Sequence, residues 1–300
     1  FGDNNGKAIA YTSGGDPMLT YLWDNGENTT LAEYLTGGYH TFTVTDDRGC
    51  EVSDSIFIPE SSEIISTLVI DSTINCYGGT NGIISVSTTG GYSDYLYSWS
   101  HDPINTSTGV VDTAFNLSYG SYYLTTEDSL GCYVTDSVYL IEPNLLTVQP
   151  IELSWVSCYG DSNGVAQAVV HGGTMPYSFS WDGNPYINNN TINTLNAGTH
   201  TVSVLDAKGC IATGSVIIHE PAELVVVITN NLPVYCNGMS TGSLVALAAG
   251  GNAGYSYLWD DNPSLPQTTA TAVNLEAGVY TIIVTDSRGC TASVQDTVIV

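Results

Sequence analysis

Residues 285–290 read TDSRGC, and the chain carries three near-copies of this stretch. They are TDDRGC at 45–50, LDAKGC at 205–210 and, one residue longer, TEDSLGC at 126–132. Their cysteines stand at positions 50, 132, 210 and 290, so successive copies are 82, 78 and 80 residues apart. Recurrence at a nearly constant period is typical of tandem structural units. The turn therefore predicts four consecutive repeats.

Other short motifs recur in step with this turn. Each copy is preceded by a Gly-Gly pair and then by an aromatic-x-Trp element. Three repeats also begin with a Cys-x-Gly stretch: CYGGTNG from Cys76, CYGDSNG from Cys158 and CNGMSTG from Cys236. The opening FGDNNG fits the same frame if a cysteine preceded Phe1. The motifs predict a truncated repeat at residues 1–60, followed by repeats at 61–142, 143–220 and 221–300.

Composition indicates an all-β protein and excludes some partners. The chain has 31 glycines, many Thr, Ser, Val and Tyr residues, and few helix-forming residues. With 30 acidic and only 4 basic residues, its net charge is -26. Such a chain has no basic surface for nucleic acid and is disfavoured at anionic membranes. No apolar run approaches the ~18 residues of a spanning helix, so we expect no direct membrane insertion.

Within one repeat, apolar residues alternate with polar or small ones. Residues 164–173 (GVAQAVVHGG) and 199–209 (THTVSVLDAKG) are examples. This period of two predicts half-buried strands, six or seven per repeat, joined by Gly, Asn, Asp and Pro turns. The expected fold is four tandem immunoglobulin-like antiparallel β-sandwiches arranged end to end, with almost no helix. One tryptophan per repeat is expected to fill the core between the two sheets: Trp23, Trp99, Trp181 and Trp259.

A second recurring element is Leu-x-x-Gly-x-aromatic, just before the next-to-last expected strand. The aromatic residue is Tyr122 in the second repeat and Tyr280 in the fourth, with His40 and His200 in its place in the other two. Its position is typical of a tyrosine corner, in which the hydroxyl bonds to backbone a few residues upstream. Histidine can donate a similar hydrogen bond.

Taken together, these motifs resemble the SprB repeat of Bacteroidota surface proteins. The resemblance rests on Cys-x-Gly-x-x-Asn-Gly, Gly-Gly, Tyr-x-Trp, Leu-x-x-Gly-x-Tyr, Val-x-Asp-x-x-Gly-Cys and a closing Glu-Pro, and it covers all four repeats except the start of the first. The histidine corners, the order IPE at 58–60 and MSTG at 239–242 depart from the pattern. The resemblance implies a very large cell-surface adhesin, exported by the type IX route and, in gliding species, carried as mobile surface filaments.

The cysteines allow two pairing schemes. In a head-to-tail stack, the first turn of one repeat faces the last turn of the next, which pairs Cys76 with Cys210 and Cys158 with Cys290. Pairing within repeats is the alternative, and reduced thiols are a third possibility. The disulfide candidates are Cys50, Cys76, Cys132, Cys158, Cys210, Cys236 and Cys290. The limit of about 7 Å between bonded α carbons makes the choice a geometric one, which peptide mapping without reductant distinguishes.

No motif predicts catalysis or a resident cofactor. GDSNG at 160–164 and GMSTG at 238–242 match the Gly-x-Ser-x-Gly elbow, but the equivalent stretches of the other repeats lack the serine. The five histidines show no metal-ligand spacing. We expect no metal site, with Ca²⁺ in acidic loops such as residues 3–6 as the alternative to solvated turns.

Two surface features invite functional readings. The 20 tyrosines are expected mainly to pack on strands, and the alternative is stacking on sugars. Asp-Ser/Thr-aliphatic triplets resemble the O-glycosylation motif of Bacteroidota, and chance in a chain rich in Ser, Thr and Asp is the alternative. The intact mass of native material distinguishes these two readings. The glycan candidates are Ser55, Thr113, Ser137 and Thr297.

The sequence therefore predicts a non-enzymatic structural array: a stiff, acidic, extracellular stalk or filament segment of an adhesin at the cell surface. The expected partners are neighbouring repeats of the same long chain, surface polysaccharide and other filament chains. The competing hypothesis is an array of carbohydrate-binding modules. That hypothesis requires exposed aromatic rows at the same place in each repeat.

Overall fold

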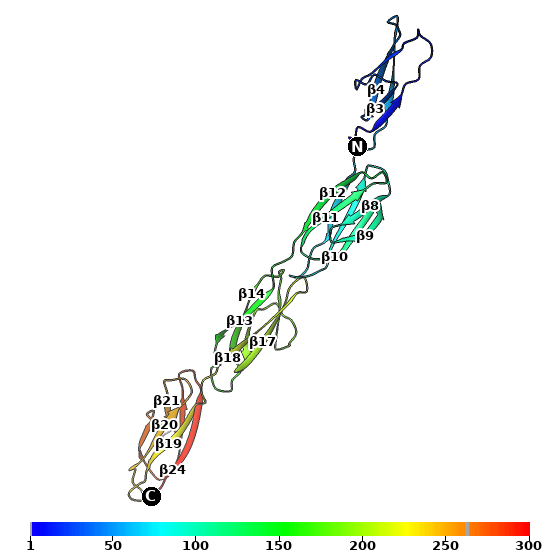
Figure 1. Cartoon of the computed structure of the whole chain (residues 1–300). Helices are drawn as coiled ribbons and strands as arrows, with labels where there is room; N and C mark the ends of the chain where they lie inside the picture. Colours follow the sequence, from blue (N-terminus) through cyan, green and yellow to red (C-terminus); the bar gives the residue numbers. More distant parts are fainter. Residues whose placement is uncertain (1, 262–263) are drawn as a thin grey trace. The chain divides into compact units, whose positions relative to one another are not determined.

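The computed structural model describes residues 2–261 and 264–300, with all of their side chains except those of 104 and 105. These residues form twenty-four β-strands in eight sheets and no helix (Figure 1). The prediction of an all-β fold is confirmed. Each sheet takes its strands from a single repeat. The chain divides into two compact units, Phe1–Glu142 and Pro143–Val300, which we describe one at a time.

The third repeat, in the second unit, shows the basic pattern. Its six strands are β13 (Thr147–Ser154), β14 (Gly164–His171), β15 (Ser178–Trp181), β16 (Thr191–Leu195), β17 (Gly198–Leu205) and β18 (Ile211–Ile218). They form two antiparallel sheets with the orders β13-β14-β16 and β15-β17-β18. This is the A-B-E and C-F-G arrangement of an immunoglobulin-like sandwich without strand D.

The fourth repeat has the same topology. Its strands are β19 (Val225–Leu232), β20 (Gly242–Ala249), β21 (Ser256–Trp259), β22 (Thr271–Leu275), β23 (Gly278–Thr285) and β24 (Thr291–Val298). The sheet orders are β19-β20-β22 and β21-β23-β24. The TDSRGC turn at 285–290 joins β23 to β24, the last two strands of the repeat.

The first unit holds a seven-stranded and a five-stranded repeat. The second repeat contains β6 (Ile65–Ser72), β7 (Gly82–Thr89), β8 (Tyr95–Trp99), β9 (Asp102–Gly109), β10 (Val111–Leu117), β11 (Gly120–Glu127) and β12 (Tyr133–Leu140). Its additional strand β9 pairs with β8 at a sheet edge. The first repeat contains β1 (Gly6–Ile9), β2 (Thr20–Trp23), β3 (Leu31–Leu35), β4 (Gly38–Thr45) and β5 (Glu51–Ile58). These five strands correspond to the second to sixth strands of the third and fourth repeats.

The core lies between the two sheets of each repeat. Along β7 and β14, every second residue is buried over most of the strand, as the period of two predicts. One tryptophan sits at the end of the third strand of the pattern in each repeat; the exposed fractions are 2% for Trp23, 4% for Trp99, 2% for Trp181 and 1% for Trp259. Replacing such a side chain by alanine removes about 3–5 kcal/mol of stability. The tryptophans therefore hold the two sheets of each sandwich together.

In the first, second and fourth repeats the buried indole N–H of the tryptophan donates a hydrogen bond. In the third repeat it has no partner. Trp259 Nε1 donates to Thr269 O at 3.0 Å, Trp23 Nε1 donates to Thr29 O, and Trp99 Nε1 donates to the carboxylate of Asp112. Trp181 Nε1 is buried with no hydrogen-bond partner. Trp181 and Trp259 are equally buried but differ in this bond, so Trp181 serves as the control for Trp259.

We expect Trp259→Phe to destabilise its repeat by about 1–2 kcal/mol more than Trp181→Phe destabilises the third repeat. Both changes replace the indole by a smaller ring, but only the first removes an indole hydrogen bond, the one to Thr269 O. Residue-specific hydrogen exchange of β23 and β17, which carry no substitution, measures the two losses. Equal losses would contradict a role for the indole hydrogen bond.

Candidate functional site

The turn between β23 and β24 is built around one aspartate. The carboxylate of Asp286 accepts hydrogen bonds from the backbone N–H of Arg288 at 2.8 Å and of Cys290 at 2.9 Å. Its second oxygen accepts from the N–H of Asn252 at 2.7 Å, just after the Gly-Gly pair. Gly289 has φ of +89°, a conformation that favours glycine. One side chain therefore shapes the turn and fastens it to the bend that precedes β21.

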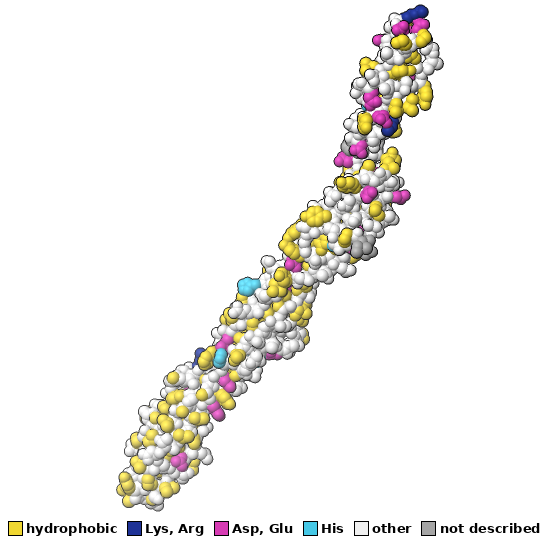
Figure 2. All heavy atoms as spheres, viewed as in Figure 1, with side chains coloured by type: hydrophobic (Ala, Val, Ile, Leu, Met, Phe, Trp, Pro, Cys, Tyr) yellow, Lys and Arg dark blue, Asp and Glu magenta, His cyan; other side chains and the backbone are white. Residues whose placement is uncertain are grey.

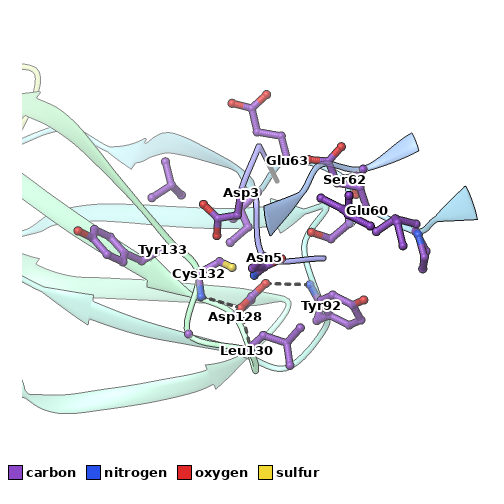
Figure 3. Close-up of a pocket in the computed structure, with 18 residues that line it drawn as sticks. Asp3, Asn5, Glu60, Ser62, Glu63, Tyr92, Asp128, Leu130, Cys132 and Tyr133 are labelled. Carbon is purple, nitrogen blue, oxygen red and sulfur yellow. Dashed lines mark hydrogen bonds between the residues drawn. The ribbon is translucent and has the colours of Figure 1, made fainter. Parts of the chain in front are cut away.

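The same arrangement occurs in every repeat, which explains why the motif recurs. The N–H groups two and four residues after the aspartate bond to Asp46, Asp128 and Asp206 as they do to Asp286. The third donor, after the Gly-Gly pair, lies at 3.1 Å from Asp128, 2.8 Å from Asp206 and 3.5 Å from Asp46. Figure 3 shows the Asp128 version with its bonds to Tyr92 and Cys132. The cysteine backbone is thus positioned by the same bonds each time.

Asp286 and Asp128 are held in the ionised form. Burial of Asp286, which is 5% exposed, opposes the charge, but the bonds from Asn252, Cys290 and Arg288 outweigh it and lower the pKa to about 2. The pKa of Asp128 is lowered in the same way, against burial, by its bonds from Tyr92, Cys132 and Leu130. Backbone N–H groups stabilise a carboxylate and not a neutral acid, which accounts for the direction.

The Gly-Gly pair brings this turn close to the start of the repeat. A Cβ on Gly250 would lie 1.9 Å from Glu223 O, so only glycine allows the two backbones to approach. In three of the four repeats a tyrosine hydroxyl donates a hydrogen bond to the carbonyl of the first glycine of the pair. These tyrosines are Tyr95, Tyr177 and Tyr255. The sequence analysis missed this contact. The signal was present, since these tyrosines stand at a constant distance after the pair.

In the second unit, the fourth repeat's turn meets the first turn of the third repeat. Cys290 forms a disulfide with Cys158, with the α carbons 5.6 Å apart. Asn252 Nδ2 donates to Ser157 O at 3.0 Å and to Asp286 Oδ2 at 3.0 Å. Cys290 is only 8% exposed. The joint is therefore a covalent bond beside a hydrogen-bonded amide, and both depend on the turn aspartate.

The other cysteines are divided between two states. Cys50, Cys132 and Cys236 have free thiols, whereas Cys76 and Cys210 are disulfide-bonded. Because Cys290 is bonded to Cys158, the alternative bonds Cys236–Cys290 and Cys158–Cys210 within repeats are not formed. Sequence spacing left this choice open because it does not say which turns of two sandwiches meet.

In the first three repeats, the first turn is capped by the glutamate that closes the repeat. Glu220 Oε2 accepts from Gly160 N at 2.8 Å, and Glu142 Oε2 accepts from Gly78 N at 2.6 Å. Glu60 caps Gly2 in the first repeat, although its order with proline is reversed there. The closing Glu-Pro motif alone does not predict this contact. The glutamate fixes the turn that carries the joint cysteine.

The aromatic residue of the Leu-x-x-Gly-x-aromatic element bonds to backbone a few residues upstream, as the sequence predicts. Tyr122 Oη donates to Ser118 O at 2.8 Å and Tyr280 Oη to Glu276 O at 3.1 Å. In the third repeat, His200 Nε2 bonds to Asn196 O at 2.9 Å, while Nδ1 lies 2.7 Å from Asp182 Oδ2. His40 makes the equivalent contacts in the first repeat. Both ring nitrogens face acceptors, which favours the doubly protonated imidazolium.

This geometry makes the third repeat sensitive to pH. Burial lowers the pKa of His200, but the bonds to Asp182 and Asn196 outweigh it, and the net shift is upward from 6.5. A raised folded-state pKa means that the stabilisation is complete below about 6.5 and is lost as pH rises through the folded value. We expect amide exchange at Thr201, which donates to Asp182, to accelerate over this window after correction for intrinsic rates. His200→Tyr is expected to remove the effect; a persisting pH dependence in that variant would contradict the assignment.

The remaining sequence candidates do not gather into a second site. Ser162 and Ser240 of the Gly-x-Ser-x-Gly matches precede strands β14 and β20, not helices. Among the described residues, no group of three or more His, Cys, Asp or Glu side chains is placed to hold a metal. No helix in the described ranges is long and apolar enough to cross a membrane. Figure 2 shows few basic side chains among the acidic and hydrophobic ones on the visible face.

Three of the four glycan candidates are exposed and lie on last strands. They are Ser55 on β5, Ser137 on β12 and Thr297 on β24. Thr113 is half-buried, and the neighbouring Asp112 accepts the indole N–H of Trp99 at 2.7 Å. Glycosylation at the three exposed sites stays a prediction. The third repeat has Gly214 in place of the aspartate, where a Cβ would lie 2.7 Å from Pro150 Cδ.

Among the described residues, the packed pairs of exposed aromatic side chains differ from repeat to repeat. Tyr39 packs at a tilt against Phe57 in the first repeat, and Tyr119 packs edge-on against Tyr139 in the second. Trp155, 53% exposed, packs at a tilt against His219 in the third. Phe57 and Tyr139 occupy equivalent positions, but their aromatic partners do not.

Comparison with known proteins gives one family and several distant folds. No curated protein matches the chain. A tetra-tandem repeat from the extending region of a large adhesion protein is 13% identical, covering 93% of this chain and 90% of that one, with a TM-score of 0.31. The eight N-terminal immunoglobulin domains of Down syndrome cell adhesion molecule are 14% identical, covering 98% of this chain and 52% of that one, with a TM-score of 0.32.

A C-terminal fragment of intimin, solved with the intimin-binding domain of its translocated receptor, is 13% identical, covering 56% of this chain and 67% of that one, with a TM-score of 0.30. These scores carry no argument about function. The family comparison is independent of them. The SprB repeat matches residues 156–185 of the third repeat and 229–264 of the fourth, so these two segments are similar to SprB repeats.

Proposed function

We propose that this chain is a structural segment of a large extracellular adhesin, in which successive sandwiches are locked to one another as a stalk. The observation that carries the proposal is the Cys158–Cys290 bond between consecutive repeats. A module that only bound a ligand would need no covalent link to its neighbour. A load-bearing array benefits from such a link, because force then passes from one sandwich to the next through a covalent bond.

An extracellular location is part of this proposal. Disulfides persist in oxidising compartments and are rare in the cytosol. The match to the SprB repeat supports the same location. We further propose the surface of a Bacteroidota cell, with export by the type IX route and a role in attachment or gliding. A net charge of -26 keeps such an array soluble and apart from anionic surfaces.

Within the second unit, the third and fourth repeats are bonded to one another by Cys158 and Cys290. We propose that the neighbouring repeats of one chain are each other's principal partners.

Carbohydrate binding is the less favoured function. It requires an aromatic platform at a constant place, whereas the exposed aromatic pairs differ from repeat to repeat. A single platform, such as Trp155 with His219, would make one repeat a binder and leave the others as spacers. Catalysis is not proposed, because the two Gly-x-Ser-x-Gly matches precede strands and not the helix that a nucleophile elbow requires.

Solution scattering combined with a glycan array tests the proposal. A stalk of four sandwiches, each with strands of about 26 Å and end loops, should have a largest dimension well above ~100 Å. A compact globule of this length would have a radius of gyration of only about 19 Å. The stalk proposal expects the long dimension and no glycan bound by any repeat. A compact particle, or glycan binding at the same place in several repeats, would overturn it.

A further inference from the structure

Two covalent connections cross the joint between the third and fourth repeats. One is the peptide chain, which runs from Ile218 at the end of β18 to Val225 at the start of β19. The other is the Cys158–Cys290 disulfide, which links the turn after β13 to the turn before β24. Two separate covalent routes therefore lead from the start of β13 to the end of β24.

The disulfide route leaves out most of the two repeats. It follows the backbone along β13 to Cys158, crosses to Cys290 and continues along β24. Residues 159–289, which we call the bypassed segment, are not part of it. Breaking peptide bonds of the bypassed segment interrupts the peptide route and leaves the disulfide route whole. The two ends of the chain then stay joined through the sulfur atoms.

The targets of Arg- and Lys-specific proteases lie in this bypassed segment. After Arg48 the chain contains only two basic residues, Lys208 and Arg288. Arg288 stands two positions before Cys290, so the bond from Cys290 back to Cys158 encloses it. Lys208 lies inside the same loop. A cut by such a protease after Arg48 therefore does not touch the disulfide route.

Both basic residues are placed where a protease can reach them. Lys208 and Arg288 are exposed in the turns before β18 and β24, and an exposed glycine follows each of them. Exposed turns are preferred sites of proteolytic nicking. Along the rest of residues 49–300 the same proteases find no target. These two turns therefore decide whether this part of the chain is severed.

A nick in either turn should leave the flanking strands paired. β23 and β24 pair over all eight residues of each strand, and so do β17 and β18. After a cut following Arg288, Asp286 can still accept from the N–H of Cys290, and Asn252 can still donate to Ser157 O. We expect the nicked fourth repeat to keep its sheet and its contact with the third.

We infer that the third and fourth repeats remain one covalent unit when an Arg- or Lys-specific protease cuts them. Hydrolysis adds one water molecule across the peptide bond after Lys208 or Arg288 and yields a carboxylate and an amine, and the disulfide takes no part. The use of this property rests on the proposed stalk function. In a stalk, one severed peptide bond would otherwise release everything beyond the cut.

The test uses the full chain with one dye at each end and with Lys7→Gln and Arg48→Gln, so that Lys208 and Arg288 are the remaining trypsin sites. Both replaced side chains are exposed, so the fold should tolerate glutamine. The folded chain is treated with trypsin, its free thiols are alkylated, and it is run on a denaturing gel. We expect the two dyes to migrate together without reductant and to separate completely with reductant.

Two matched variants locate the protection. Adding Cys290→Ser should release the C-terminal dye without reductant, because fragment 289–300 then contains no cysteine. Restoring Arg48 should release the N-terminal dye. Arg48 occupies the same turn position in the first repeat, but it lies outside the bypassed segment, and fragment 1–48 contains no cysteine. Circular dichroism of each variant checks that it is folded.

Either of two results overturns the inference. Dyes that separate without reductant in the Arg48→Gln chain would show that the disulfide route does not hold the repeats together. Dyes that stay together even with reductant would show that the folded turns resist trypsin and that the bond adds no protection. The stalk function is tested separately by scattering, so an extended particle that trypsin severs would lose this property and keep the proposed function.

Discussion

Pulled between its two ends, the chain should lengthen by about 450 Å less with the Cys158–Cys290 bond intact than after reduction. The bond spans 132 residues, and an extended chain measures about 3.3–3.6 Å per residue. These residues include most of the third and fourth repeats. Force therefore bypasses them through the disulfide, and they cannot be stretched out even if their sandwiches unfold. Single-molecule force spectroscopy measures this difference directly.

The comparison is cleanest in a Cys76→Ser/Cys210→Ser background, where only the Cys158–Cys290 bond is at issue. Adding Cys290→Ser should give the full extension with or without reductant. If this bond carries load in the stalk, the oxidised chain must extend less than the reduced chain. Equal extension of the oxidised and reduced background chains would contradict it.

Asp286→Asn should destabilise the fourth repeat by about 3 kcal/mol. Three backbone N–H groups, those of Asn252, Arg288 and Cys290, lose a charged acceptor in a buried place. Asparagine offers a single oxygen and brings two N–H donors of its own. Hydrogen exchange at Arg288 and Cys290 measures the loss at the turn. An effect below about 1 kcal/mol would show that the aspartate does not hold the turn.

Asp46→Asn in the first repeat is the matched control. Asp46 is only half-buried, and its third donor, Asp16 N, lies 3.5 Å away. We expect a clearly smaller loss than at Asp286. Equal losses would mean that the contact with the Gly-Gly bend contributes nothing.

The same carboxylate predicts an acid transition. The pKa of Asp286 falls from 3.8 to about 2 on folding, so its stabilisation is present above about 3.8 and disappears as pH falls towards 2. The shift is equivalent to about 2 kcal/mol. The turn and the contact with Ser157 should therefore loosen first in acid, whereas Asp286→Asn should lack this transition.

The fold was predictable because local and global patterns agree. Strands with a period of two, one tryptophan per unit and a Gly-containing turn before the last strand lead to a two-sheet sandwich. The strand order of β13 to β18 then completes the immunoglobulin-like topology. Strand β9 was not separately predicted, since residues 102–109 show no clear alternation of apolar and polar side chains.

The candidate site was only partly predictable. Sequence spacing located Cys158 and Cys290 but left their partners open, because pairing depends on how two sandwiches meet. The roles of Glu220 and Asn252 were missed for the same reason. Each bonds to a residue at least 60 positions away, Gly160 and Ser157 respectively. A repeated motif shows that a residue matters to the unit but not which distant backbone atom it contacts.

Tryptic digestion without reductant tests the joint most directly. In the Cys76→Ser/Cys210→Ser chain, cleavage after Arg48, Lys208 and Arg288 releases fragments 49–208, 209–288 and 289–300. The account predicts that fragment 289–300 stays bonded to fragment 49–208 through Cys158 and Cys290. Finding it bonded to fragment 209–288 through Cys236, or released as a free thiol, would contradict a covalent joint between consecutive repeats.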